Sequence, residues 1–350
     1  MKPEKGRTAR MDRELEEKLQ NYKERLNDEE VEKLVQDTKQ LQQYQEEPSV
    51  AEDLEKIPVL RREDISREIA PIYNEVLDFD STPVIYHEIE TNGIGYVDLL
   101  FDLSGVSEEM LPYAGILQAV LGIIDTNNYE YGELFNEINV HTGGIGTSLE
   151  LYPNVEKVKE KEFRATFEIK TKALYGKLPV AFRMMQEILT ESKLTDERRL
   201  KEILSMAKSR LQMRFQSSGH TTAALRAMSY ASPLSKLKDL TSGIGYYEIV
   251  KQIEEHFEEE KDTLIKNLQT LTKLLFRPEN MMVSYTAARE GMEGLEKLVS
   301  ELKAKLFTEP VQGQPCVIHC EKKNEGFKTS SKVQYVARAG NFIDGGASYT

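Results

Sequence analysis

The chain has 350 residues, of which 39% are hydrophobic and 30% charged, a composition typical of a folded protein rather than a disordered one. Its formal net charge of −13, with no basic stripe to offset it, excludes a nucleic-acid partner, and no apolar stretch approaches the roughly 20 residues that span a bilayer. Two cysteines fit a reducing compartment, and the N-terminus resembles neither a secretory signal nor a transit peptide, so we expect a cytoplasmic protein.

Residues 1–82 are predicted to form a helical linker or hinge. Two charged helices are expected within residues 11–47, the second capped by Asn27 or Asp28. Their apolar residues recur at spacings of three and four, which gives each helix only a narrow apolar stripe: Leu15, Leu19, Tyr22 and Leu26, then Leu34, Val35, Thr38 and Leu41. Such stripes must pack against something else. A free-standing coiled coil is disfavoured because sustained heptads are missing.

Residues 83–307 are predicted to form an α+β domain. Val84–Ile89 and Ile94–Leu103 read as a hairpin around the tight turn Asn92-Gly93. Helices are expected at Leu111–Ile124 and Tyr131–Val140, strands at 145–152 and 163–171, mostly helix from Lys177 to Phe276, a strand at Met281–Thr286 and a helix at Gly294–Leu306. Blocks of strands and helices with antiparallel hairpins favour the α+β class.

Residues 308–350 are expected to begin a following α+β domain, with strands at Cys316–Cys320 and Val333–Arg338. Because the sequence stops where this β-rich unit starts, we expect a fragment of a longer chain. The run from Cys316 through His319 to Cys320 superficially suggests a metal site. On a strand, however, His319 would point away from the two cysteines, so two small structural cysteines are the favoured interpretation.

Two segments carry a family resemblance. The run YHEIETNGIGYVDLLFDLSGVSEEMLPYAGILQAVLG at 86–122, followed by YGELFNEINVHTGGIGTSLELY at 131–152, resembles the third domain of presequence-type proteases, a branch of the insulinase (pitrilysin) zinc metallopeptidase superfamily. The acidic helices before it resemble the hinge of those enzymes, and VQYVARAGNFIDGGASYT resembles the start of their fourth domain. The resemblance implies an insulinase-type unit, with an antiparallel sheet and helices packed on one face.

The resemblance also implies that the catalytic chemistry is absent from this chain. In the first unit of such enzymes a helix carries His-x-x-Glu-His, in which the histidines bind zinc and the glutamate activates water. The matching positions here are Gly115, Gln118 and Ala119. Glycine and alanine offer no ligand and glutamine is a poor base, so no catalytic residue, metal site or cofactor is expected in this fragment. Zinc would belong to the missing catalytic half.

The segment His141-Thr142-Gly143-Gly144 has two interpretations. The glycines can simply make the turn from helix to strand, where a positive φ is needed. Alternatively, the four residues line a peptide chamber, since glycine allows close approach of another backbone.

The leading hypothesis is therefore a non-catalytic section, hinge and chamber wall, of a zinc-dependent peptidase that degrades peptides. Its expected partners are the catalytic half of the same polypeptide and peptide substrates. The alternative is a peptide-binding or assembly module related to inactive processing-peptidase subunits. A coiled-coil scaffold is disfavoured by the long α+β portion.

Overall fold

The computed structural model describes residues 6–68, 73–154, 156–157, 162–328 and 333–340. The chain forms two compact units, Met1–Pro71 and Ile72–Thr350. Helices of the first unit are α1 (Arg7–Lys23), α2 (Asp28–Glu46), α3 (Ala51–Leu54) and the 3₁₀ turn η1 (Arg62–Asp64). Within the described ranges, no helix is both long and apolar enough to cross a membrane.

The first unit confirms the two helices predicted from the narrow apolar stripes. Asn27 accepts a hydrogen bond from the Glu30 amide while the Glu30 carboxylate accepts one from the Asn27 amide, so α2 begins with a capping box. None of the residues of α1 or α2 is buried, and Leu15 and Leu19 are 57% and 59% exposed. The stripes therefore find no apolar cover within their own unit.

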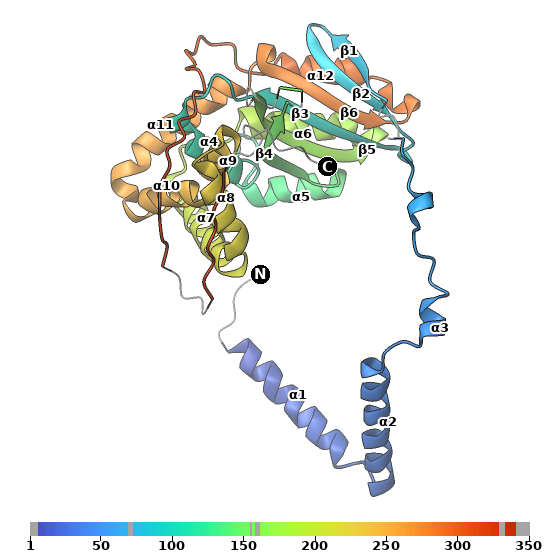
Figure 1. Cartoon of the computed structure of the whole chain (residues 1–350). Helices are drawn as coiled ribbons and strands as arrows, with labels where there is room; N and C mark the ends of the chain where they lie inside the picture. The colour runs from blue at the N-terminus through green and yellow to red at the C-terminus, as the bar shows by residue number, and fades with distance from the viewer. Residues whose placement is uncertain (1–5, 69–72, 155, 158–161, 329–332, 341–350) are drawn as a thin grey trace. The chain divides into compact units, whose positions relative to one another are not determined.

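The second unit is built on a six-stranded sheet of order β1-β2-β6-β3-β5-β4 (Figure 1). Its strands are β1 (Glu75–Phe79), β2 (Thr82–Glu88), β3 (Ile94–Asp102), β4 (Ile145–Pro153), β5 (Phe163–Leu174) and β6 (Met281–Ala287). All neighbours pair antiparallel except β2 and β6, which are parallel. The predicted purely antiparallel sheet is thus corrected to a mixed one, because a long helical connection returns the chain beside β2 in the same direction.

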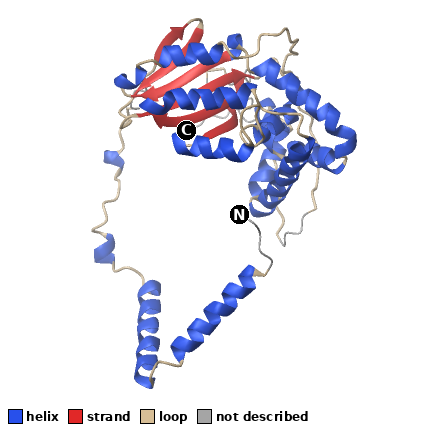
Figure 2. Cartoon of the chain, turned by 180° about the vertical axis from the view of Figure 1, so that it is seen from behind, coloured by secondary structure: helices blue, strands red, loops and turns tan. Residues whose placement is uncertain are grey.

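Helices cover one face of the sheet and gather at one end of it. The helices α5 (Tyr131–His141), α6 (Leu178–Thr190) and α12 (Leu295–Lys303) lie side by side across one face (Figures 1 and 2). The remaining helices are α4 (Leu111–Val120), α7 (Glu197–Ser217), α8 (Gly219–Ser229), α9 (Pro233–Ser242), α10 (Ile244–Glu255) and α11 (Phe257–Leu275). Short 3₁₀ turns are η2 (Glu108–Met110), η3 (Tyr175–Lys177), η4 (Pro278–Asn280) and η5 (Arg289–Met292). This architecture is α+β.

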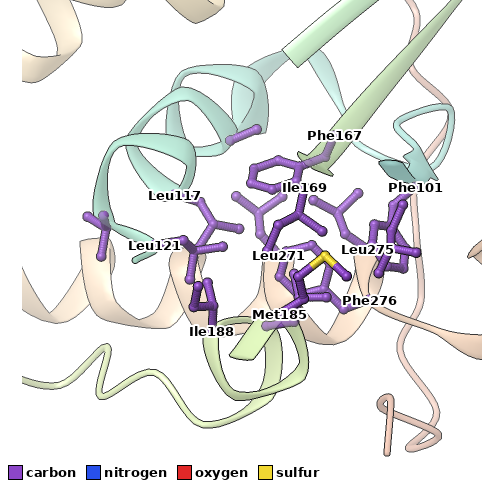
Figure 3. Packing of buried hydrophobic residues seen from close by; sticks show 14 of the residues in the cluster. Phe101, Leu117, Leu121, Phe167, Ile169, Met185, Ile188, Leu271, Leu275 and Phe276 are labelled. Atoms are coloured by element: carbon purple, nitrogen blue, oxygen red, sulfur yellow. The ribbon is translucent and has the colours of Figure 1, made fainter. Parts of the chain in front are cut away.

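The core lies between the sheet and these helices (Figure 3). Phe276, at the end of α11, meets Phe101 of β3 and Phe167 of β5 edge-to-face, with ring centroids 5.1 and 5.3 Å apart. Alternate residues of each central strand are buried, as in β6, where Met281, Val283, Tyr285 and Ala287 point inward. The period-2 pattern therefore fixes which face of the sheet the helices cover.

Two segments differ from the sequence-based expectation. Strand β1 lies within residues 1–82, assigned to the linker, and pairs with β2 across a turn in which Asp80 and Ser81 have positive φ. Neither 316–320 nor 333–338 forms a strand. The first of these segments runs extended over the second unit, with the amides of Gln314 and Cys316 donating to the carbonyls of Gly105 and Ser104 at 3.0 and 2.9 Å.

Candidate functional site

The helix that would carry a zinc motif is packed too tightly at its first motif position. Gly115 of α4 is buried, and a Cβ placed there would lie 2.6 Å from the Thr241 carbonyl oxygen of α9 and 2.9 Å from the Tyr246 ring of α10. No side chain fits without moving the backbone of a neighbouring helix. The glycine is therefore explained by helix packing as well as by the missing ligand.

Gln118, at the position of the motif glutamate, is held by strand β4. Its Nε2 donates to the Thr147 carbonyl oxygen at 3.4 Å, and Thr147 Oγ1 donates to the Gln118 carbonyl oxygen at 2.9 Å. Ala119 is half-buried on the same helix. The three motif positions thus connect α4 to its neighbours, and they do not fit a zinc ion, because they supply no nitrogen, thiolate or carboxylate ligand.

No other group of metal ligands is assembled in the described part of the chain, which holds no cluster of three or more His, Cys, Asp or Glu side chains suited to an ion. His319 Nδ1 lies 2.9 Å from the Glu108 carboxylate, and the same carboxylate accepts the His319 amide at 3.0 Å. Cys316 is half-buried and Cys320 is exposed. Both cysteines are free thiols in a segment that is not a strand.

The His141–Gly144 segment makes the connection from α5 to β4. Gly144 has φ +99°, and the Gly143 amide donates to the Lys172 carbonyl oxygen at 2.7 Å. Thr142 closes the helix, because its hydroxyl donates to the Ile138 carbonyl oxygen at 2.7 Å. Lys177 Nζ lies 3.3 Å from His141 Nδ1. The predicted turn with a positive φ is confirmed at Gly144.

The sheet face opposite α5, α6 and α12 carries a buried polar cluster that the sequence analysis missed. The Glu168 side chain of β5 is fully buried and its carboxylate accepts from Tyr152 at 2.7 Å and from Thr166 at 2.5 Å. Lys170 Nζ lies 2.6 Å from Glu168 and 3.3 Å from Asp98 of β3. Only the register between β3 and β5, in which Asp98 is opposite Lys170, brings Asp98 into this cluster.

The cluster perturbs the ionisation of its carboxyl groups. Burial, together with the neighbouring Glu168 carboxylate, raises the pKa of Asp98 to about 7. Burial also opposes ionisation of Glu168, but the hydrogen bonds from Lys170, Thr166 and Tyr152 outweigh it and lower the pKa of Glu168 below its ordinary value. The ordinary charged state at neutral pH is thus Glu168 paired with Lys170, with Asp98 shared between two protonation states.

The sequence profile of the family of domains associated with subfamily C of the M16 peptidases matches residues 1–253. The chain belongs to that family. Relatives of this peptidase-associated chain include Protein HypA of Clostridium perfringens, 33% identical over 99% of this chain and 35% of HypA. They also include presequence protease 1, chloroplastic/mitochondrial, of Arabidopsis thaliana, 27% identical over 95% of this chain and 31% of the protease. The peptidase-associated chain spans about a third of the length of these relatives.

Two solved structures share part of the architecture of the peptidase-associated chain. A conserved protein from Enterococcus faecalis V583 superimposes with a TM-score of 0.48 at 14% identity, covering 69% of this chain and 54% of the other. A peptidase M16 inactive domain from Pseudomonas fluorescens gives a TM-score of 0.45 at 11% identity over 72% of this chain and 54% of the other. By its family match and its sequence relatives, the peptidase-associated chain is a non-catalytic domain related to presequence proteases.

Proposed function

We propose that this chain is the hinge and one chamber wall of a zinc-dependent peptidase that degrades peptides, and that the metal and the catalytic residues belong to a separate catalytic half of the same polypeptide. The observation that carries the proposal is the packing of α4. The helix keeps its place in the fold, but Gly115 lies against Thr241 and Tyr246 where a zinc ligand would have to fit. The family match and the share of the relatives that the chain spans support it.

The hinge role is supported by the first unit. Helices α1 and α2 present apolar stripes that have no cover in their own unit, so burying them requires another surface. A helical hairpin of this kind can join two halves that swing together around a substrate. The natural cover for the stripes is the catalytic half.

The wall role is supported by the open sheet face. A face intended only for bulk water has no reason to hold a fully buried Glu168 beside Lys170 and Asp98, because burying charges costs free energy that only good pairing offsets. Such a face suits a closed chamber that encloses an unfolded peptide. His141–Gly144 enters the proposal as a lining segment at the start of the edge strand β4.

The test combines this chain with the separately expressed catalytic half encoded by the same gene. We expect binding at micromolar concentrations and chelator-sensitive cleavage of an unstructured peptide that neither half gives alone. A chain beginning at residue 72 serves as the matched control, and it should restore less activity because the hinge helices are missing. Binding without any gain in cleavage would overturn the proposal and favour the peptide-binding or assembly module, and absence of binding would overturn it outright.

A further inference from the structure

We propose that the free edge of β4, together with the cavity at its C-terminal end, is a docking site for an extended peptide that carries basic side chains. This inference deepens the proposed chamber wall and rests on it. It concerns a site on this chain alone, so it can be tested without a catalytic half.

The backbone of β4 has one paired side and one open side. Strand β4 is last in the sheet order, with β5 as its neighbour. The Asn154 amide donates to the Glu162 carbonyl oxygen at 2.9 Å, which sets the alternation along this antiparallel pair: even-numbered residues of β4 bond to β5. The amides and carbonyls of the odd-numbered residues therefore point outward, namely those of Ile145, Thr147, Leu149 and Leu151.

One of these outward groups already has an amide partner. The Thr147 carbonyl oxygen accepts from the Gln118 side-chain amide at 3.4 Å, in the position where the backbone amide of an added strand would donate. Among the described residues, no hydrogen bond joins the outward amides of Leu149 and Leu151 to another residue. An edge of this kind is a template for strand addition, in which main-chain hydrogen bonds supply affinity and side-chain pockets supply specificity.

A cavity of about 670 Å³ lies where β4 ends. Tyr152 and Asn154 of the β4 side, Phe163 and Arg164 of β5, Leu237 of α9 and Cys316 of the extended segment are among its lining residues. A peptide that runs along β4 reaches this cavity with its next side chains. The mixture of aromatic and aliphatic walls with a few charged groups is typical of a side-chain pocket.

The charges around the edge and the cavity favour a basic occupant. Asp102 and Glu162 line the cavity with Arg164 as the basic residue among the lining side chains, which leaves one net negative charge. Glu150 projects from β4 on the open sheet face, 3.7 Å from Lys170 at the nearest atoms. With a chain net charge of −13 behind it, the site attracts cationic peptides and repels anionic ones.

The binding test uses the full chain and two fluorescent peptides of about ten residues, one alternating valine with lysine and one alternating valine with glutamate. We expect the lysine peptide to bind about tenfold more tightly, with an affinity that weakens as salt rises. Equal affinity for the two peptides, or binding of the glutamate peptide alone, would overturn the basic occupant.

The edge itself is tested with Leu149→Pro, which removes one outward amide without touching the ladder to β5. Leu149→Ala is the matched control, because it loses the same side-chain packing and keeps the amide. Leu149→Pro should bind the lysine peptide about fivefold more weakly than Leu149→Ala, the effect of one lost hydrogen bond. Equal binding by the two folded variants would exclude the β4 edge.

The cavity is tested through its thiol. In a Cys320→Ser variant Cys316 is the remaining cysteine, so the rate of its alkylation reports access to the cavity. We expect saturating lysine peptide to slow alkylation about threefold or more, and an unchanged rate would remove the cavity from the site. Because these measurements need no catalytic half, their failure would leave the hinge and wall proposal standing, and failed reconstitution would leave the peptide site standing.

Discussion

The guanidinium of Arg226 lies 2.6 Å from Asp239 Oδ2, a carboxylate that is buried beneath the N-terminus of α10. Asp239 also accepts the amides of Ile244 and Gly245 at 3.0 and 3.2 Å, so it caps α10 while Arg226 of α8 balances its charge. One ion pair thus fixes α8, α9 and α10 to one another.

Replacing this arginine should therefore weaken the helical end of the second unit. Arg226→Ala leaves the buried Asp239 carboxylate without its cation, and we expect a loss of about 3 kcal/mol in the free energy of unfolding. Arg198→Ala is the control, because Arg198 is 90% exposed beside Glu202 and should cost at most about 0.5 kcal/mol. Urea unfolding of both variants measures the difference, and equal stabilities would contradict a structural role for the pair.

Gly115→Ala should destabilise the second unit although alanine favours helices. The added Cβ would lie 2.6 Å from a backbone oxygen of α9, so α4 has to move, at a cost of about 1 to 3 kcal/mol. Gly132→Ala on α5 is the matched control, because nothing lies within 4 Å of its added Cβ, and it should gain up to about 1 kcal/mol. Thermal unfolding of the two variants should shift in opposite directions.

Rebuilding the zinc motif should fail for the same reason. The triple variant Gly115→His, Gln118→Glu and Ala119→His supplies the ligand types, but the first histidine has no space between α4, α9 and α10. We expect a destabilised protein without stoichiometric zinc, whereas the double variant that keeps Gly115 should stay folded. Elemental analysis after gel filtration, with circular dichroism as the check on folding, decides the case; one tightly bound zinc in a natively folded triple variant would refute the packing argument.

Stability should fall as the pH rises through the range in which Asp98 ionises. In the unfolded chain Asp98 ionises near pH 4, whereas in the folded protein its pKa is about 7, so folding binds a proton between these values. Asp98 therefore costs progressively more stability from about pH 4 up to pH 7. Compared with Asp98→Asn, the wild type should lose about 2 to 3 kcal/mol more between pH 5 and pH 8.

Urea midpoints at several pH values measure this difference. Glu109→Gln, a change at an exposed carboxylate, should run parallel to the wild type. A wild-type curve parallel to that of Asp98→Asn would show that Asp98 titrates normally in the folded state.

Limited proteolysis should cut first between residues 47 and 68, where all described side chains are exposed and the helical elements are single turns. Residues 94–125 should resist, since they contain β3 and α4. The segment 308–328 should be protected in the wild type and become cleavable in Glu325→Ala, because Glu325 binds Arg226 at 2.8 Å and Tyr230 at 2.6 Å. A first cut within 94–125 would be inconsistent with the fold.

Short-range patterns in the sequence predicted much of the second unit. The alternation in Ile94–Leu103 and Met281–Thr286 gave the strands and their buried faces, and Asn27 marked the start of α2. The extended run at Cys316–Cys320 was wrong as a strand, because its β-branched and small residues find only two backbone hydrogen bonds, to Ser104 and Gly105, and no neighbouring strand. Strand β1 was missed because its five residues follow a long polar segment and show little alternation.

By itself, then, the sequence determined the α+β class, the family and the loss of zinc ligands at Gly115, Gln118 and Ala119, because residue identities and periods of two or 3.6 are local properties of the chain. Tertiary structure alone decided the parallel pairing of β2 with β6, the contact of Gly115 with Thr241, and the meeting of Asp98 with Lys170. Each of these joins residues far apart in the chain, and strand register and helix packing, which depend on the whole core, set which atoms meet.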